Sequence, residues 1–144
     1  PQVISLGALD MVNFGPPETV PEKFKPRRFY QHNPTVTLMR TTADENAKLG
    51  EEIARKVAAA KGPAAVMLPL HGVSAIDRAG QPFDDPVARQ ALYRAIRGGR
   101  ENVELIEVDC HINDREFAEA AARRLLELIK EGKPHTEARR HGEE

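Results

Sequence analysis

Apolar residues in this chain fall into two kinds of pattern. Short, nearly continuous apolar runs predict β-strands at residues 3–9, 35–39, 64–70 and 103–108. Stripes at helical spacing predict three amphipathic helices, with core positions at Leu49, Ile53, Val57 and Ala60, at Ala88, Leu92, Ala95 and Ile96, and at Phe117, Ala121, Leu125 and Leu128. Because helices between strands imply right-handed crossovers, the pattern predicts an α/β fold with a mostly parallel sheet of about four or more strands.

Capping signals set the expected starts of these helices. Thr42 and Glu45 match a capping box, in which a threonine is followed by a glutamate three residues later. Asp85–Pro86 is typical of a cap followed by a first-turn proline. Either Asn113 or Asp114 is expected to cap the third helix.

The segment from Phe14 to Pro34 interrupts the regular pattern. It holds five prolines among many charges, and proline removes backbone donors and resists both helices and central strands. We therefore expect a long, Pro-rich ordered arm after the first strand. Cations and aromatic residues mix over residues 23–30, and we interpret them as an arm that packs on a neighbouring domain or subunit rather than as a base-stacking surface.

Composition narrows the class of protein. A chain of 144 residues with 40% apolar and 30% charged residues suits one globular domain, which we assign to residues 1–132, followed by a polar tail at 133–144. The net charge of −1 gives no electrostatic case for nucleic acid or an anionic membrane as partner. No apolar run approaches the roughly 18 residues that span a bilayer.

Two further features concern the compartment and the whole protein. The single cysteine, Cys110, fits a reducing cytosol, so we expect a cytoplasmic location. The chain has no initiator methionine and enters a strand almost at once, so we interpret it as the C-terminal half of a larger two-domain protein. The missing N-terminal domain would then supply part of any interdomain site.

Polar clusters follow three of the predicted strands, at residues 40–42, 71–77 and 109–114. Because the carboxyl ends of parallel strands share one edge, these clusters are expected to converge on one small-molecule site. Arg40, Thr41 and Thr42 combine a guanidinium and two hydroxyls with a helix N-terminus, which favours phosphate or carboxylate. Thr42 is equally well explained as the helix cap.

The other two clusters carry candidate acid–base and metal chemistry. Gly72 would let the backbone approach a ligand, Ser74 would donate a hydroxyl, and Asn113 would add a polar contact. The catalytic candidates are His71, Asp77, Asp109 and His111, and the candidate metal ligands are His71, Asp109 and His111. A tight turn at Gly72, a solvated His71 and a loop-bonding His111 are the structural alternatives. No Walker or Gly-x-Gly-x-x-Gly motif occurs, so the chain carries no self-contained nucleotide motif.

Several motifs in order resemble the C-terminal domain of the Tm-one-like ATP-binding family, a largely uncharacterised group that includes a plant inhibitor of tobamovirus RNA replication. The motifs are Asp10–Gly15, Glu18–Pro21, Tyr30–Pro34, Thr37–Thr42 and His111–Asp114, and the resemblance covers residues 3–131. It implies a Rossmann-like three-layer domain, two such domains in the intact protein, association into homodimers, and binding of ATP with Mg. It implies no catalytic residues.

Three functions follow as hypotheses. The first, which we favour, is a domain that binds ATP or another phosphorylated or anionic ligand at the carboxyl edge of the parallel sheet. The second is a metal-assisted or acid–base enzyme that acts on a small organic acid. The third is a dimerisation or interaction module, in which the Pro-rich arm makes the contact.

Overall fold

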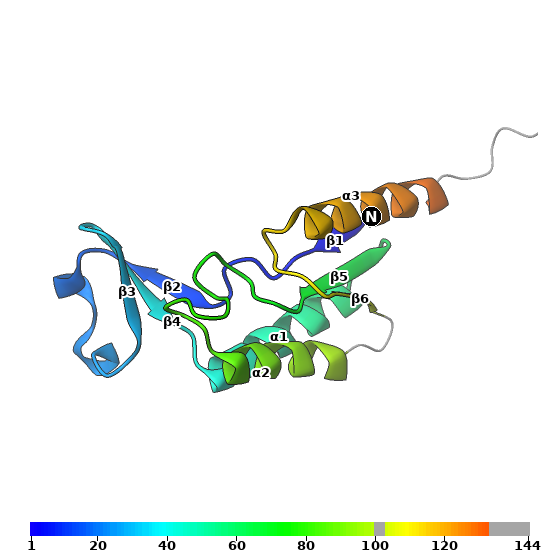
Figure 1. Cartoon of the computed structure of the whole chain (residues 1–144). Helices are drawn as coiled ribbons and strands as arrows, with labels where there is room; N and C mark the ends of the chain where they lie inside the picture. Colours follow the sequence, from blue (N-terminus) through cyan, green and yellow to red (C-terminus); the bar gives the residue numbers. More distant parts are fainter. Residues whose placement is uncertain (100–102, 133–144) are drawn as a thin grey trace, which may run out of the picture.

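The computed structural model describes residues 1–99 and 103–132, and these form two small sheets and three α-helices (Figure 1). The parallel sheet has the strand order β1-β5-β6, with β1 at Gln2–Ile4, β5 at Ala64–Pro69 and β6 at Glu104–Val108. The antiparallel sheet has the order β2-β4-β3, with β2 at Met11–Phe14, β3 at Phe29–Asn33 and β4 at Val36–Arg40. The helices are α1 (Ala43–Ala58), α2 (Pro86–Gly98) and α3 (Arg115–Glu131).

The parallel sheet is covered on both faces. Helices α1 and α2 lie against one face and α3 against the other (Figure 1). The central strand β5 alternates between the two sides: Val66 and Leu68 join the α1–α2 core, and Met67 packs with Phe117 on the α3 side. Both Leu68 and Met67 are fully buried, so the predicted α/β fold and the predicted covered strand are confirmed.

Helix starts follow the capping signals. Thr42 caps α1 through the predicted capping box: its hydroxyl accepts from the Glu45 amide, and the Glu45 carboxylate accepts from the Thr42 amide. Asp85 caps α2 through the Ala88 amide at 3.0 Å, with Pro86 in the first turn. Ala60, predicted on the α1 stripe, lies beyond the end of that helix.

The second predicted strand is present, but its assignment to the parallel sheet is wrong. Residues 36–40 form β4, which pairs antiparallel with β2 and β3 and takes no part in the parallel sheet. The described residues therefore hold three parallel strands and not four. The first predicted strand, 3–9, is also too long: β1 ends at Ile4, and Ala8 turns the chain with a φ of 59° before β2 begins at Met11.

The predicted arm is partly regular structure. It contains two short 3-10 turns, η1 (Pro17–Thr19) and η2 (Glu22–Phe24), and then strand β3. Three of its prolines, Pro16, Pro17 and Pro21, precede or begin the 3-10 turns, where a missing amide costs nothing. Pro26 follows η2 and Pro34 follows β3, so no proline lies in β3. The antiparallel sheet projects from one end of the parallel sheet (Figure 1) and is fastened to α1 by Arg27, which bonds both carboxylate oxygens of Glu45 at 3.0 and 2.7 Å.

None of the described helices is both long enough and apolar enough to cross a membrane.

Candidate functional site at the carboxyl edge of the parallel sheet

The loops that follow β5 and β6 are joined by backbone hydrogen bonds. The Leu70 amide donates to Val108 at 3.0 Å, the His71 amide to Cys110 at 3.0 Å, and the Ile112 amide to Gly72 at 3.1 Å. The chain segments 70–72 and 108–112 therefore lie side by side at the carboxyl edge of the parallel sheet. Helix α3 begins directly after this segment, so its N-terminus lies at the same edge.

Gly72 makes the close approach in this region possible. Its φ of +130° is one that residues with a side chain rarely adopt. A Cβ atom at this position would lie 1.7 Å from the Asp77 carbonyl oxygen and 3.0 Å from the His111 ring. The requirement for glycine is thus set by the folding of the loop on itself.

Asp77 is the centre of a buried ion cluster. Its Oδ1 accepts from Arg40 Nη2 at 3.0 Å and from Arg89 Nη1 at 2.7 Å, and its Oδ2 accepts from the Val73 amide at 2.9 Å. The carboxylate is fully buried. Asp77 therefore fixes the β5 loop to β4 and α2, and it does not face the open edge where a catalytic group would act.

The Arg40 guanidinium also makes its hydrogen bonds within the chain. Its Nε donates to the Phe83 carbonyl at 3.0 Å, and its Nη1 donates to the Asp10 carbonyl at 3.3 Å. Only 4% of the residue is exposed. The expectation that Arg40 would lie as a free cation at the parallel edge is wrong, because β4 belongs to the other sheet and directs this side chain into the junction between the sheets.

The two threonines next to Arg40 also have partners within the chain. Thr41 is buried, and its hydroxyl donates to the Leu9 carbonyl at 2.7 Å and accepts from the Asn46 amide group at 2.9 Å. Thr42 is the cap of α1. Residues 40–42 thus join the two sheets and start α1, and they do not form an open anion seat.

A second buried carboxyl, Asp10, has a different environment from Asp77. Ser74 Oγ lies 2.6 Å from Asp10 Oδ2, and the Ile76 and Asp77 amides donate to Ser74 Oγ at 3.3 and 3.2 Å. Asp10 is fully buried, and its Oδ1 has no hydrogen-bond partner among the described residues. Burial raises the pKa of the Asp10 carboxyl above its ordinary value, the Ser74 hydroxyl lowers it in part, and nearby Asp77 raises it further.

His111 connects the β6 loop to the β5 loop. Its Nε2 lies 2.8 Å from the Ser74 carbonyl, and its Nδ1 accepts from the Asn113 amide at 3.1 Å. These partners fit a neutral imidazole with its hydrogen on Nε2. The ring is 1% exposed. His111 therefore holds the β5 and β6 loops together, as in the alternative in which its ring only bonds the loop. It does not join the exposed His71 at the edge.

Asp114 is the N-cap residue of α3, but its side chain does not cap the helix. Its Oδ2 accepts instead from the His111 amide at 2.9 Å. The predicted capping hydrogen bond is therefore wrong, although the helix does begin at the predicted place. Asn113 is exposed next to this helix start, and its backbone amide is the one that bonds His111.

His71 and Asp109 form an exposed pair at the edge. His71 Nε2 lies 2.7 Å from Asp109 Oδ1, and both side chains are more than half exposed. Within residues 1–99 and 103–132, no three His, Cys, Asp or Glu side chains are grouped as a metal site would require. Two of the candidate residues, His71 and Asp109, thus meet at this edge, whereas His111 makes its bonds to Ser74 and Asn113 and not to Asp109.

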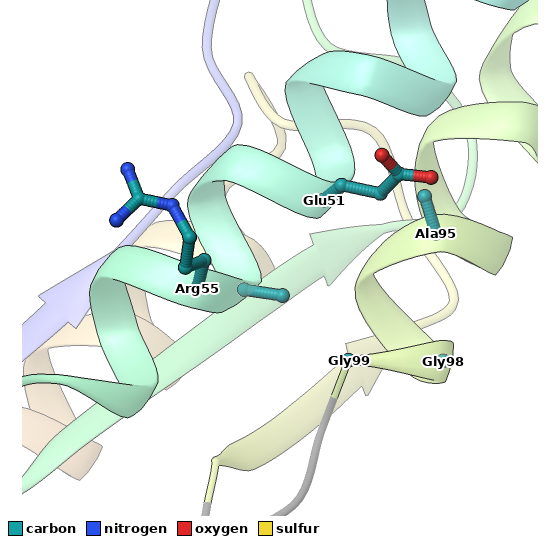
Figure 2. Close-up of a pocket in the computed structure, with 6 residues that line it drawn as sticks. Glu51, Arg55, Ala95, Gly98 and Gly99 are labelled. Atoms are coloured by element: carbon teal, nitrogen blue, oxygen red, sulfur yellow. The ribbon is translucent and has the colours of Figure 1, made fainter.

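An open pocket of about 400 Å³ lies elsewhere, in the groove between α1 and α2. Figure 2 shows Glu51 and Arg55 of α1 on one side and the end of α2 on the other. The helices approach closely here because Gly50 faces Ala95 and Gly99 faces Ala54: an added Cβ would lie 2.7 and 2.6 Å from those methyl groups. Since α2 runs away from the carboxyl edge, this pocket is separate from the strand-end loops.

Sequence reasoning missed three polar residues that support the edge: Arg89, Tyr93 and Asn46. Arg89 bonds Asp77 and Asp84, the fully buried Tyr93 hydroxyl donates to the Pro69 carbonyl, and Asn46 bonds Thr41. A signal was present for Tyr93, which adjoins Leu92 on the apolar stripe of α2. For Arg89 and Asn46 the helical pattern gave no indication of burial.

These features define an α/β domain in which polar strand-end loops meet the start of a helix. Residues 1–129 match the C-terminal domain of the Uncharacterised protein family (UPF0261), and the chain belongs to this family. The chain is 48% identical over 132 residues to a UPF0261 protein of Clostridium tetani, covering 90% of this chain and 33% of the relative.

Two other relatives extend the comparison. A UPF0261 protein of Rhizobium meliloti is 49% identical over 126 residues, which are 84% of this chain and 31% of the relative. The ToMV resistance protein Tm-1 of Solanum lycopersicum is 47% identical over 131 residues, which are 89% of this chain and 17% of that protein. The resemblance to the Tm-one-like family is confirmed. The chain spans about a third of the bacterial relatives and less of the plant one.

Proposed function

We propose that this domain binds a small phosphorylated anion, with Mg-ATP as the first candidate, at the carboxyl edge of the β1-β5-β6 sheet. The observation that carries the proposal is the start of α3, a helix of 17 residues that begins at this edge without a side-chain cap. The first amides of a helix and its dipole attract negative charge, and phosphate commonly binds there. The family resemblance favours ATP among such anions.

Exposed groups around the helix start suit this ligand. His71 and Asn113 lie on the two joined loops and offer an imidazole and a side-chain amide to phosphate oxygens. The exposed Asp109 carboxylate fits the role of a Mg²⁺ ligand, since Mg²⁺ in nucleotide complexes uses one or two carboxylates, phosphate oxygens and water. Mg²⁺ held near this carboxylate would reduce the repulsion between the carboxylate and the phosphates.

The role of residues 40–42 changes under this proposal. Arg40, Thr41 and Thr42 hold β4, the β1 loop and α1 together, so they position the ligand loops from behind. Ser74 remains a ligand candidate because it is half-buried on the β5 loop, whereas Gly72 is buried and its amide and carbonyl bond Pro69 and Ile112. A Rossmann-like arrangement with further strands would follow if the rest of the protein extends the parallel sheet.

Calorimetric titration of Mg-ATP tests the proposal, first with this domain and then with the intact protein. We expect His71→Ala to weaken binding by about 1 kcal/mol, or roughly fivefold, because it removes one polar contact. His32→Ala, on exposed strand β3, is the matched control and should bind as the unaltered domain does. Absence of binding to both proteins, or equal affinity in the two histidine variants, would contradict a site at this edge.

A second function is supported by the His71–Asp109 pair. A histidine with a carboxylate 2.7 Å from its ring nitrogen is the arrangement of a general base with an orienting group. We therefore propose, as the alternative, proton abstraction from a small organic acid. In D2O, NMR would show deuterium entering such an acid next to its carboxylate, and His71→Ala should abolish this exchange. Equal exchange in His71→Ala would remove the enzyme hypothesis.

A further inference from the structure

Asp10 and Asp77 are both fully buried carboxyls, but only Asp77 has partners that suit a negative charge. Asp77 receives two arginine bonds and one amide bond. Asp10 has the Ser74 hydroxyl alone, and its Oδ1 lacks a partner among the described residues. An ionised carboxylate in such a place is costly, whereas a protonated carboxyl is neutral and needs fewer partners.

Arg40 lies near enough to lower the pKa of the Asp10 carboxyl in part, but within the described residues no cationic side chain forms an ion pair with that carboxyl. Arg40 donates to the Asp10 backbone carbonyl and gives its other contacts to Asp77, Thr41 and Phe83. Arg89 bonds Asp77 and Asp84. Asp77 is a like charge close enough to raise the Asp10 pKa. His111 reaches the Ser74 carbonyl and not the carboxyl.

The Ser74 hydroxyl has only one hydrogen, so the acceptor of that hydrogen depends on whether Asp10 is ionised or protonated. When Asp10 is ionised, that hydrogen is donated to Asp10 Oδ2 across 2.6 Å. When Asp10 is protonated, Oδ2–H donates to Ser74 Oγ and the serine hydrogen is released to another acceptor. Ser74 Oγ can accept this new hydrogen bond. The Asp77 amide that now donates to Ser74 Oγ also donates to the Ser74 carbonyl at 3.1 Å, so it keeps a partner if it leaves the hydroxyl.

Ser74 is only half-buried, and it lies on the loop that forms the proposed ligand edge. We propose that Asp10 and Ser74 couple anion binding to proton uptake: an anion that accepts the Ser74 hydrogen binds together with one proton, which resides on Asp10. The proton comes from solvent to Asp10 Oδ2, and the serine hydrogen turns from Asp10 to the ligand oxygen. No covalent bond to the ligand forms. This inference rests on the proposed function and adds a proton to it.

Calorimetry in buffers of different ionisation enthalpy measures this proton directly. Mg-ATP is titrated into the domain at neutral and mildly alkaline pH, where its phosphates remain ionised, in Pipes and in Tris. The difference in binding heat gives the number of protons taken up. For the unaltered domain we expect a fractional proton uptake that grows from neutral to mildly alkaline pH, as free Asp10 becomes ionised, and that does not exceed one proton. Uptake should be near zero for Asp10→Asn and Ser74→Ala.

Two further variants separate this pair from other groups. Asp44→Asn changes an exposed carboxylate in the first turn of α1 and should leave the uptake unchanged. His71→Ala should bind more weakly but still take up the proton. If Asp10→Asn folds poorly, the pH dependence of the affinity serves as the test. The affinity of the unaltered domain for Mg-ATP should fall by up to tenfold for each unit that the pH rises, and the affinity of Ser74→Ala should not depend on pH in this way.

The outcomes are distinct. Binding without proton uptake overturns the coupling and leaves the proposed function intact. Uptake that persists in Asp10→Asn, or that disappears in His71→Ala, assigns the proton to another group and also overturns it. Absence of Mg-ATP binding to the domain and to the intact protein ends the proposed function, and the coupling with it.

Discussion

Arg40 Nη2 lies 3.0 Å from Asp77 Oδ1, and this ion pair is buried where the two sheets meet. Arg40 comes from the last position of β4, and Asp77 from the loop after β5. The pair therefore connects two sheets that share no strand. Its main effect should be on stability and on the placement of the loop that follows β5.

Arg40→Ala should lower the free energy of unfolding by about 3–5 kcal/mol, because it leaves the Asp77 charge buried with one partner fewer. Urea unfolding followed by circular dichroism measures this change. Arg55→Ala removes an exposed arginine from its bond to Glu52 and should alter stability little. Comparable small losses in both variants would show that the Arg40–Asp77 pair is not buried.

Asp10→Asn should change stability in a pH-dependent way. The folded-state pKa of Asp10 is raised, so the folded protein holds the proton more tightly than the unfolded chain, and its stability falls as pH rises from about 4, the ordinary aspartate value, through the folded pKa. Above that pKa the loss is complete.

The variant lacks this titration. The stability of Asp10→Asn minus that of the unaltered domain should therefore be lowest in acid, increase with pH and then level off. Thermal unfolding at a series of pH values measures it. A difference that is constant with pH would mean that the Asp10 pKa is not raised.

Gly72→Ala should be strongly destabilising. The new Cβ would overlap the Asp77 carbonyl and the φ of +130° would be strained, so we expect a loss of more than about 3 kcal/mol. Gly80→Ala provides the control, because Gly80 has a φ of +80° but no atom within 4 Å of an added Cβ. Its cost should be only the conformational strain, about 1–2 kcal/mol. Equal effects would argue against the close approach of Gly72 to Asp77.

Leu68→Ala should cost about 2–5 kcal/mol, because Leu68 is fully buried in the central strand between the sheet and the α1–α2 layer. Leu126→Ala, on the exposed side of α3 with 58% of its surface accessible, should change stability by less than about 0.5 kcal/mol. Chemical denaturation of both variants gives the comparison. A near-neutral Leu68→Ala would contradict the central position of β5.

Local signals in the sequence predicted local structure well. The capping box at Thr42, the Asp85 cap and the apolar run of β5 act over a few residues, and each is present. The formation of strands β2 and β3 could not be predicted from such local signals. Both strands are short, mixed in polarity and stabilised mainly by pairing with β4, which periodicity does not reveal.

The candidate site was predicted at the level of its loops and not of its side chains. The β5 and β6 loops do meet, because parallel strands end on one edge. Whether a polar side chain faces solvent or a buried partner depends on contacts far along the chain. Arg40 is paired with a residue 37 positions away, and that contact turns a predicted ligand group into a support.

The antiparallel sheet and α1 are inserted between two neighbouring parallel strands, and this bears on how the chain folds. The β1–β5 pairing joins residue 2 to residue 64, whereas the β3–β4 pairing joins residue 33 to residue 36. Closing a long loop costs more chain entropy than closing a short one, and pairings distant in sequence form slowly. We therefore expect the β3–β4 hairpin to form early and β1 to join the sheet late, which would make the parallel sheet one of the last parts of the domain to be completed.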